Sequence, residues 1–232
     1  MSRMAVAARS ILLHQVESTT HSLCGGIAES LFAAPMDGHT DATVHEAVIN
    51  VSVCIDSLIT GCCVLLAEPL PQPPKYVSLD KDTNRRQSNA TAPGRGKQSV
   101  QLDIERVFAQ EIQIFDPEAI CSGTVEGLVA AVLKPVLKCV GETVRIGNLD
   151  TVAYKNANAD IMYLKQVGNM FLKQAIADTD RLAEQVSMAV FSRYVHSNDI
   201  AKSSDHFESM QVSRSVREAL VITAKRTVFF PR

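Results

Sequence analysis

The sequence predicts an all-α fold, organised as an antiparallel helical bundle. The chain has 232 residues, 46% of them hydrophobic, which is enough to build a sizeable core. In most segments the apolar residues recur every three or four positions, which is the period of an amphipathic helix. RTVFF near the C-terminal end is the one candidate strand. Because the connections in the second half are short, neighbouring helices there are expected to run antiparallel.

The N-terminal region, residues 1–68, contains two predicted helices. The first covers about residues 5–33, with CGG at 24–26 as its weak point, and the second runs from Thr43 to Ala67 before Pro69 ends it. The apolar run 48–67 has the length of a membrane span. However, Asp56 lies inside it, and an acid at mid-span costs about 3 kcal/mol on the insertion scale. We therefore interpret this run as a buried helix.

Residues 69–99 differ in composition from the rest of the chain. This segment is rich in proline, carries an excess of basic charge and has few large apolar residues. Such a composition buries too little surface to offset the entropy lost on ordering. We predict a disordered or extended linker between the two helical regions. GRGKQS within it lacks the first glycine and the Ser or Thr that a phosphate-binding loop requires.

The C-terminal region, residues 100–232, reads as a helical bundle. Its clearest helix spans Val125 to Val144, where nine branched aliphatic residues form one wide stripe, Pro135 is expected to introduce a kink, and Gly147-Asn148 follows. We expect this helix to be central and covered by its neighbours. The other predicted helices are a short one after Val100, one at 158–177, one at 179–195 capped by Asp178, and one from about 206.

Composition and motifs argue against several functions. The net charge of −2 gives no electrostatic footprint for nucleic acid, so no nucleic-acid partner is expected. None of the six cysteines forms a C-x-x-C pair, which argues against zinc and favours structural thiols in a reducing compartment. Neither G-x-S-x-G nor H-E-x-x-H occurs. We therefore predict no catalytic, cofactor-binding or metal-binding residues and a protein that is not an enzyme.

Asp160 is the one acid in KNANADIMYLKQVGNMFLKQ, residues 155–174. It precedes an apolar stretch, so we expect it near a helix N-terminus, where a carboxylate satisfies free backbone donors and favours the positive end of the helix dipole. General acid–base catalysis would need a second titratable group at a defined site. No such group lies nearby in the sequence, so a structural role is favoured.

Three stretches of the second half resemble a known family. They are DIERVFAQEIQIF (103–115), LVAAVLKPVLKCVGETVR (128–145) and ADIMYLKQVGNMFL (159–172). They resemble the C-terminal region of the vacuolar protein sorting-associated protein 51 (fat-free) family, which belongs to the GARP vesicle-tethering complex. The third stretch matches the family's Asp-x-x-aromatic-Leu signature with Asp160, Tyr163 and Leu164. The resemblance implies that Asp160 starts a helix and that Tyr163 and Leu164 pack inside.

The same resemblance implies a rod-like bundle of the tethering-complex type. The expected function is that of a non-enzymatic subunit in endosome-to-trans-Golgi retrograde transport. The implied partners are other tethering subunits, with SNAREs or small GTPases as further candidates. Membrane association is expected to be peripheral, through these partners, on the cytoplasmic face of the trans-Golgi network and endosomes. An alternative function is that of an imported mitochondrial helical accessory protein, since the first 16 residues carry arginines and no acid, as transit peptides do.

Overall fold

The computed structural model describes residues 3–32, 42–62, 117, 120, 124–147, 149–172, 176–198 and 205–230. These residues form an all-α helical bundle, as the sequence predicted, and no strand occurs among them. The six helices are α1 (Arg3–Phe32), α2 (Glu46–Cys62), α5 (Val125–Ile146), α6 (Thr151–Phe171), α7 (Ile176–Asn198) and α8 (Asp205–Arg226). The predicted linker at 69–99 and the predicted short helix after Val100 lie outside the described residues.

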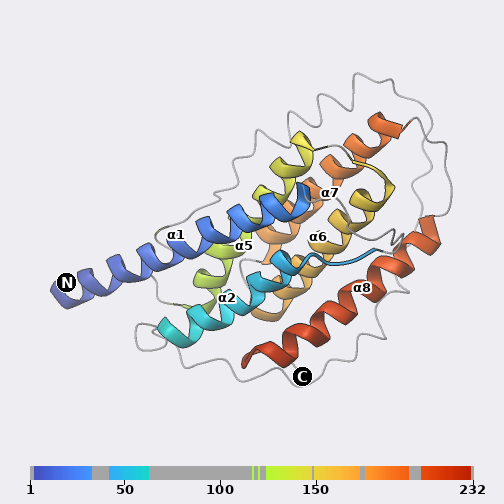
Figure 1. Cartoon of the computed structure of the whole chain (residues 1–232). Coiled ribbons are helices and arrows are strands. Elements are labelled where there is room, and N and C mark those ends of the chain that lie inside the picture. The colour runs from blue at the N-terminus through green and yellow to red at the C-terminus, as the bar shows by residue number, and fades with distance from the viewer. Residues whose placement is uncertain are drawn as a thin grey trace.

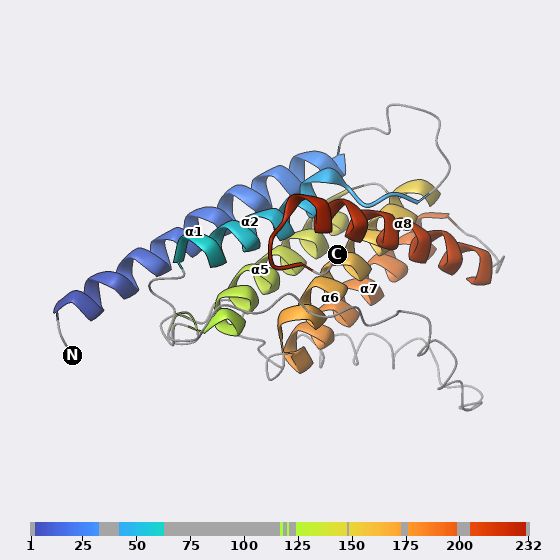
Figure 2. The ribbon, with the colours of Figure 1, turned by 90° about the horizontal axis from the view of Figure 1, so that it is seen from below.

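The helices share one long direction, and successive helices from α5 to α8 alternate in orientation (Figure 1). The N-terminal turns of α1 extend beyond the other helices, as the view from below also shows (Figure 2). Short connections between α5, α6 and α7 produce this up-and-down arrangement.

The core is organised around α5. All nine aliphatic residues of its predicted stripe are buried, and α6 and α7 both pack against it, as the sequence predicted. The helix begins at Val125, after the N-cap Thr124, whose hydroxyl accepts a hydrogen bond from the Gly127 N–H (3.1 Å), and it ends at Ile146. It continues through Pro135 as a single element.

Helix α1 also packs on α5, and this contact was not foreseen from the sequence. Leu12, Val16 and Ile27 of α1 lie in the same buried cluster as the residues of α5. The helix passes without interruption through Gly25 and Gly26, so the expected weak point does not break it. The two helical regions of the chain therefore share one hydrophobic core.

Helix α2 is buried along most of its length, which confirms the interpretation of the apolar run as a buried helix for residues 48–62; residues 63–67 lie outside the described residues. It contacts α1, α5, α6 and α8. Among the described residues, no helix combines the length and apolar character needed to cross a bilayer.

The C-terminal segment after α8 is not a strand, contrary to the expectation for RTVFF. Residues 227–230 form a bend, and Phe229 and Phe230 are both buried. Phe230 meets Phe171 edge to face, with ring centroids 5.1 Å apart. The segment folds back onto the bundle because two aromatic side chains gain more from burial than from an exposed extended strand.

Candidate functional site

Helix α6 directs three buried polar side chains toward neighbouring helices, approximately one on each successive turn. They are Asn156, Asp160 and Tyr163, and their i, i+4, i+7 spacing places them on one face. We call these three residues the α6 polar seam. Two of them bond to the segment that leads into α2 and the third bonds to the second turn of α2, so the seam aligns α2 along α6.

Asp160 does not begin a helix, and the sequence prediction was wrong on this point. Helix α6 begins at Thr151, and its N-cap is Asp150, whose carboxylate accepts from the Ala153 N–H at 2.7 Å. Asp160 lies in the third turn and is completely buried. Residues 151–157, which the prediction left outside the helix at 158–177, also belong to α6.

The Asp160 carboxylate instead binds the start of α2. Its Oδ1 accepts from the backbone N–H of His45 (2.9 Å), and its Oδ2 lies 2.7 Å from Nδ1 of the same histidine. The His45 carbonyl accepts the first helical hydrogen bonds, from Val48 and Ile49. Asp160 therefore satisfies a free donor at the N-terminus of α2 and places a negative charge near the positive end of that helix dipole.

The amide of Asn156 extends this contact by one turn. Its Oδ1 accepts from the backbone N–H of Thr43 at 2.8 Å. The two seam residues thus fix successive parts of the chain that enters α2. The sequence separation is 113 residues for Asn156–Thr43 and 115 for Asp160–His45, so no local pattern reveals either pair.

Asp160 and His45 change each other's pKa. Burial raises the pKa of Asp160, while the hydrogen bonds and charge of His45 act in the opposite direction. Burial alone lowers the pKa of His45, but the hydrogen bond and charge of Asp160 outweigh this, so the pKa rises above its ordinary value of 6.5. Folding therefore strengthens proton binding by His45, and Asp160 holds that proton on the Nδ1 side.

Tyr163 continues the seam toward α8. Its hydroxyl lies 2.7 Å from the Ser52 hydroxyl on α2 and also bonds to the Thr223 hydroxyl on α8. Burial raises the pKa of Tyr163. The neighbouring Leu164 is fully buried in the core. Tyr163 and Leu164 thus pack inside the bundle, as predicted, and the tyrosine hydroxyl links three helices.

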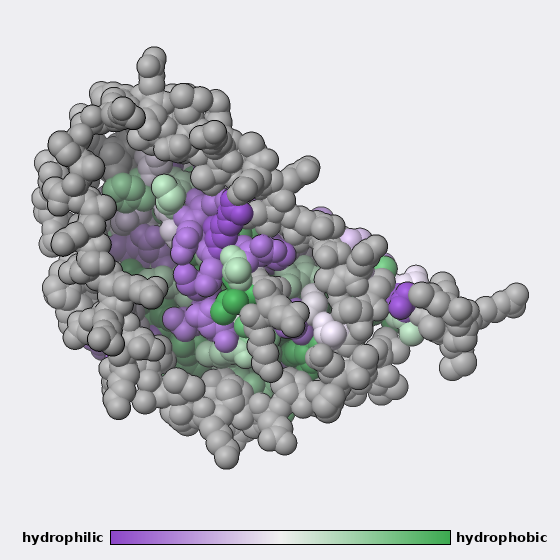
Figure 3. Space-filling model, turned by 180° about the vertical axis from the view of Figure 1, so that it is seen from behind, coloured by the Kyte–Doolittle hydropathy of each residue, from purple (hydrophilic) through white to green (hydrophobic). Residues whose placement is uncertain are grey.

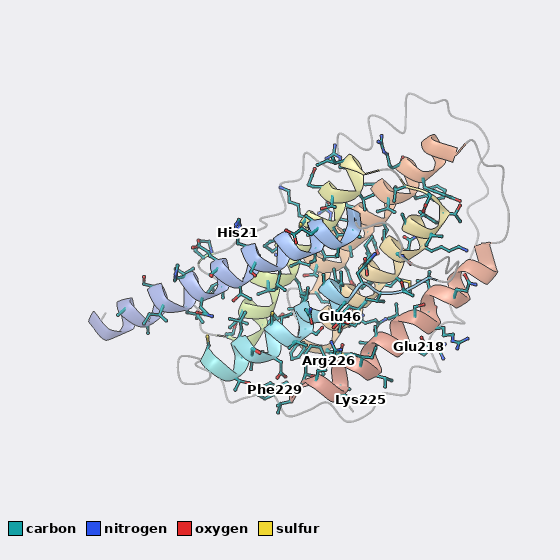
Figure 4. All side chains as sticks on the ribbon, in the orientation of Figure 1. His21, Glu46, Glu218, Lys225, Arg226 and Phe229 are labelled. Carbon is teal, nitrogen blue, oxygen red and sulfur yellow. The ribbon has the colours of Figure 1, made fainter. Side chains whose placement is uncertain are left out.

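A second buried carboxylate, which sequence reasoning did not assign, holds the C-terminal segment. Oδ1 of Asp56 on α2 accepts from the N–H groups of Val228 (2.9 Å) and Phe229 (2.8 Å). Its position inside an apolar run was the available signal, because a buried acid requires partners. Nearby, Glu46 of α2 forms an ion pair with Arg226 of α8, and the two lie close together in Figure 4.

The polar side chains of this site serve to position the helices relative to one another. A histidine oriented by a carboxylate through Nδ1 is the arrangement that general-base catalysis uses. In this protein the same carboxylate also holds the His45 backbone, and the His45 side chain is 22% exposed. Among the described residues, no group of three or more His, Cys, Asp or Glu side chains is arranged to hold a metal ion.

Comparison of the chain with protein-family models, with curated proteins and with solved structures found no match.

Proposed function

We propose that this chain is a non-enzymatic subunit of a vesicle-tethering complex that acts in endosome-to-trans-Golgi transport. The observation that supports a structural protein is the use of the signature carboxylate: both oxygens of Asp160 bind His45 and fasten α2 to α6. The specific assignment to a tethering complex rests on the resemblance of three sequence stretches.

Two of these stretches, 128–145 and 159–172, fall on α5 and α6, which pack against each other. The resembling residues thus belong to adjacent helices of one core. The stretch at 103–115 lies outside the described residues. A bundle of long helices supplies what a tether needs, which is stiffness along one direction and side-chain surfaces for other subunits.

The proposal can be tested on an exposed apolar part of the α7 surface. Met188 and Phe191 lie on consecutive turns of α7, with 67% and 56% of their surfaces exposed. In the view from behind, hydrophobic residues are interspersed with hydrophilic ones on the described surface (Figure 3). Large exposed apolar side chains are the residues that subunit interfaces bury. We assign Met188 and Phe191 to contact with another tethering subunit.

Affinity purification of the full chain, tagged at the C-terminus, tests this proposal. We expect mass spectrometry to identify other tethering subunits among the recovered proteins. The double variant M188E/F191E should lose them and keep the wild-type melting temperature, because both side chains already lie in water. The control R214A/E218A, which removes an exposed ion pair of α8, should keep them.

Recovery of no tethering subunit by the wild-type chain, under conditions in which the other subunits recover one another, would contradict the proposal. Microscopy of the same tagged chain distinguishes the alternative function. A mitochondrial signal combined with removal of the N-terminal residues would favour an imported accessory protein.

A further inference from the structure

Two cysteines from distant parts of the chain meet where α1 packs on α5. The thiol of Cys139 lies 3.5 Å from the carbonyl oxygen of Cys24, and the thiol of Cys24 lies 3.9 Å from the carbonyl oxygen of Pro135. Each thiol therefore reaches the partner helix within about one turn of the other cysteine. Both are free thiols, 115 residues apart in the sequence.

The pair is accessible from solvent. Both cysteines are only half-buried. The two residues after Cys24 are the exposed glycines Gly25 and Gly26, and a Cβ built on either would meet no atom within 4 Å. Among the described residues no side chain covers the surface at these two glycines, so a small molecule can approach the pair there.

The two thiols are also chemically unequal. The Cys139 thiol donates to the Cys24 carbonyl, and its sulfur lies 3.9 Å from the Thr143 hydroxyl oxygen. The hydrogen bond from Cys24, together with that from Thr143 and against the effect of burial, lowers the pKa of Cys139 to about 6. The same bond is the largest cause that raises the pKa of Cys24. Cys139 is therefore the more acidic thiol of the pair, and the thiolate is the reactive form of a cysteine.

We propose that Cys24 and Cys139 form a redox modification site, at which a peroxide converts the two thiols into a disulfide between α1 and α5. The Cys139 sulfur attacks one peroxide oxygen, the O–O bond breaks, and the departing hydroxide takes up a proton to become water. The Cys24 thiol then loses its proton and attacks the Cys139 sulfur, the S–O bond breaks, and a second water leaves. Two thiols and one hydrogen peroxide thus yield one disulfide and two waters.

The bond joins the N-terminal helix covalently to the centre of the bundle. Because the closed loop is long, the cross-link restricts the unfolded chain strongly. We expect the melting temperature of the oxidised protein to rise by about 10 °C relative to the reduced protein. This inference is independent of the proposed tethering function.

Peptide mapping of the full-length wild-type chain tests the inference. The native protein is treated with one equivalent of hydrogen peroxide, alkylated, and digested with a protease that cleaves after glutamate. This protease releases Cys24 in peptide 18–29 and Cys139 in peptide 127–142, each with no other cysteine. We expect a cross-linked species of these two peptides that disappears after reduction with dithiothreitol.

Cysteine variants distinguish the role of Cys139, which is oxidised first, from that of Cys24, which then attacks it. C24S should leave Cys139 as a sulfenic acid that dimedone traps, whereas C139S should prevent oxidation of Cys24. C54S is the matched control, since burial raises the pKa of Cys54, and it should keep the cross-link at the wild-type yield. Oxidation of Cys139 in the wild type without the cross-linked species, or pairing of Cys139 with another cysteine in its place, would overturn the inference.

Discussion

Replacement of Asp160 tests whether this residue caps a helix or holds His45. We call the two hydrogen bonds by which the buried Asp160 carboxylate holds His45 the clamp. The variant D160A removes the acceptor of two hydrogen bonds, both from His45, and leaves a donor at the start of α2 unpaired. Asp160 is fully buried, and loss of one partner of a buried pair costs about 3–5 kcal/mol. The higher helix propensity of alanine returns only about 0.5 kcal/mol.

The variant D160N is the more informative change. Asparagine keeps an acceptor for the His45 N–H but loses the charge that binds the ring, so we expect a cost of about 1.5–3 kcal/mol. The sequence alone suggested about 1 kcal/mol or less, because asparagine caps a helix nearly as well as aspartate. The matched control is D150N at the true N-cap of α6, which should change stability by only a few tenths of a kcal/mol.

Urea unfolding followed by circular dichroism measures these differences, with the m-value as a check that the unfolded state is unchanged. We expect the midpoints to fall in the order wild type, D150N, D160N and D160A. If D160N were as stable as D150N, the charge of Asp160 would contribute nothing and the bond to the His45 ring would be refuted as part of the clamp.

Three further predictions concern pH and packing. The pKa of His45 is raised in the folded state, so its contribution to stability is complete below pH 6.5 and is lost as pH rises through the folded pKa. Urea midpoints of the wild type should therefore fall as pH rises above 6.5, and those of H45Q should not. G141A in α5 should destabilise the protein, because the new Cβ would lie 3.1 Å from Val186 Cγ2. G168A in α6, where the nearest contacts of the new Cβ are 3.6 Å, should stabilise the protein by about 0.5–1 kcal/mol. Thermal melting of both variants tests this. L133A at a fully buried position should cost about 2–5 kcal/mol in urea unfolding, and an unchanged midpoint would contradict the central place of α5.

The pH prediction includes Asp160. Its folded pKa is also raised, so protonation of this carboxyl is favoured in the folded state. Its contribution is complete below pH 3.8 and is lost as pH rises through the folded pKa, which is the same direction as for His45. A slope that remains in H45Q at acidic pH therefore reports Asp160, and a slope above pH 6.5 that remains in H45Q would contradict the assignment to His45.

The sequence predicted helix α5 well because its information is local. A stripe of aliphatic residues at helical spacing specifies both the helix and its buried face, and Val125 to Val144 carries that stripe without a polar interruption. The antiparallel arrangement of α6 and α7 followed from short connections. The contact of α1 with α5 could not be inferred in this way, because residues about 110 positions apart share no local pattern.

The structural role of Asp160 was predicted incorrectly for a related reason. Its helix was predicted to start at 158, although Asp150, three residues after Gly147, is the cap that the structure uses. Because α6 begins nine residues before Asp160, the carboxylate cannot cap its own helix, and its partner must come from elsewhere. That partner, His45, lies in a different region of the chain, so only the tertiary structure could identify it.

A double-mutant cycle between His45 and Asp160 tests the central claim most directly, since it isolates the coupling of the two side chains from the other effects of each change. Urea unfolding at pH 6 of the wild type, H45Q, D160N and the double variant provides the four free energies. If Asp160 fastens α2 through His45, the double variant should lose less stability than the sum of the single variants, with a coupling of at least about 1 kcal/mol. Additivity within about 0.5 kcal/mol would mean that the two side chains act independently and that the bond between the Asp160 carboxylate and the His45 ring contributes nothing to the clamp.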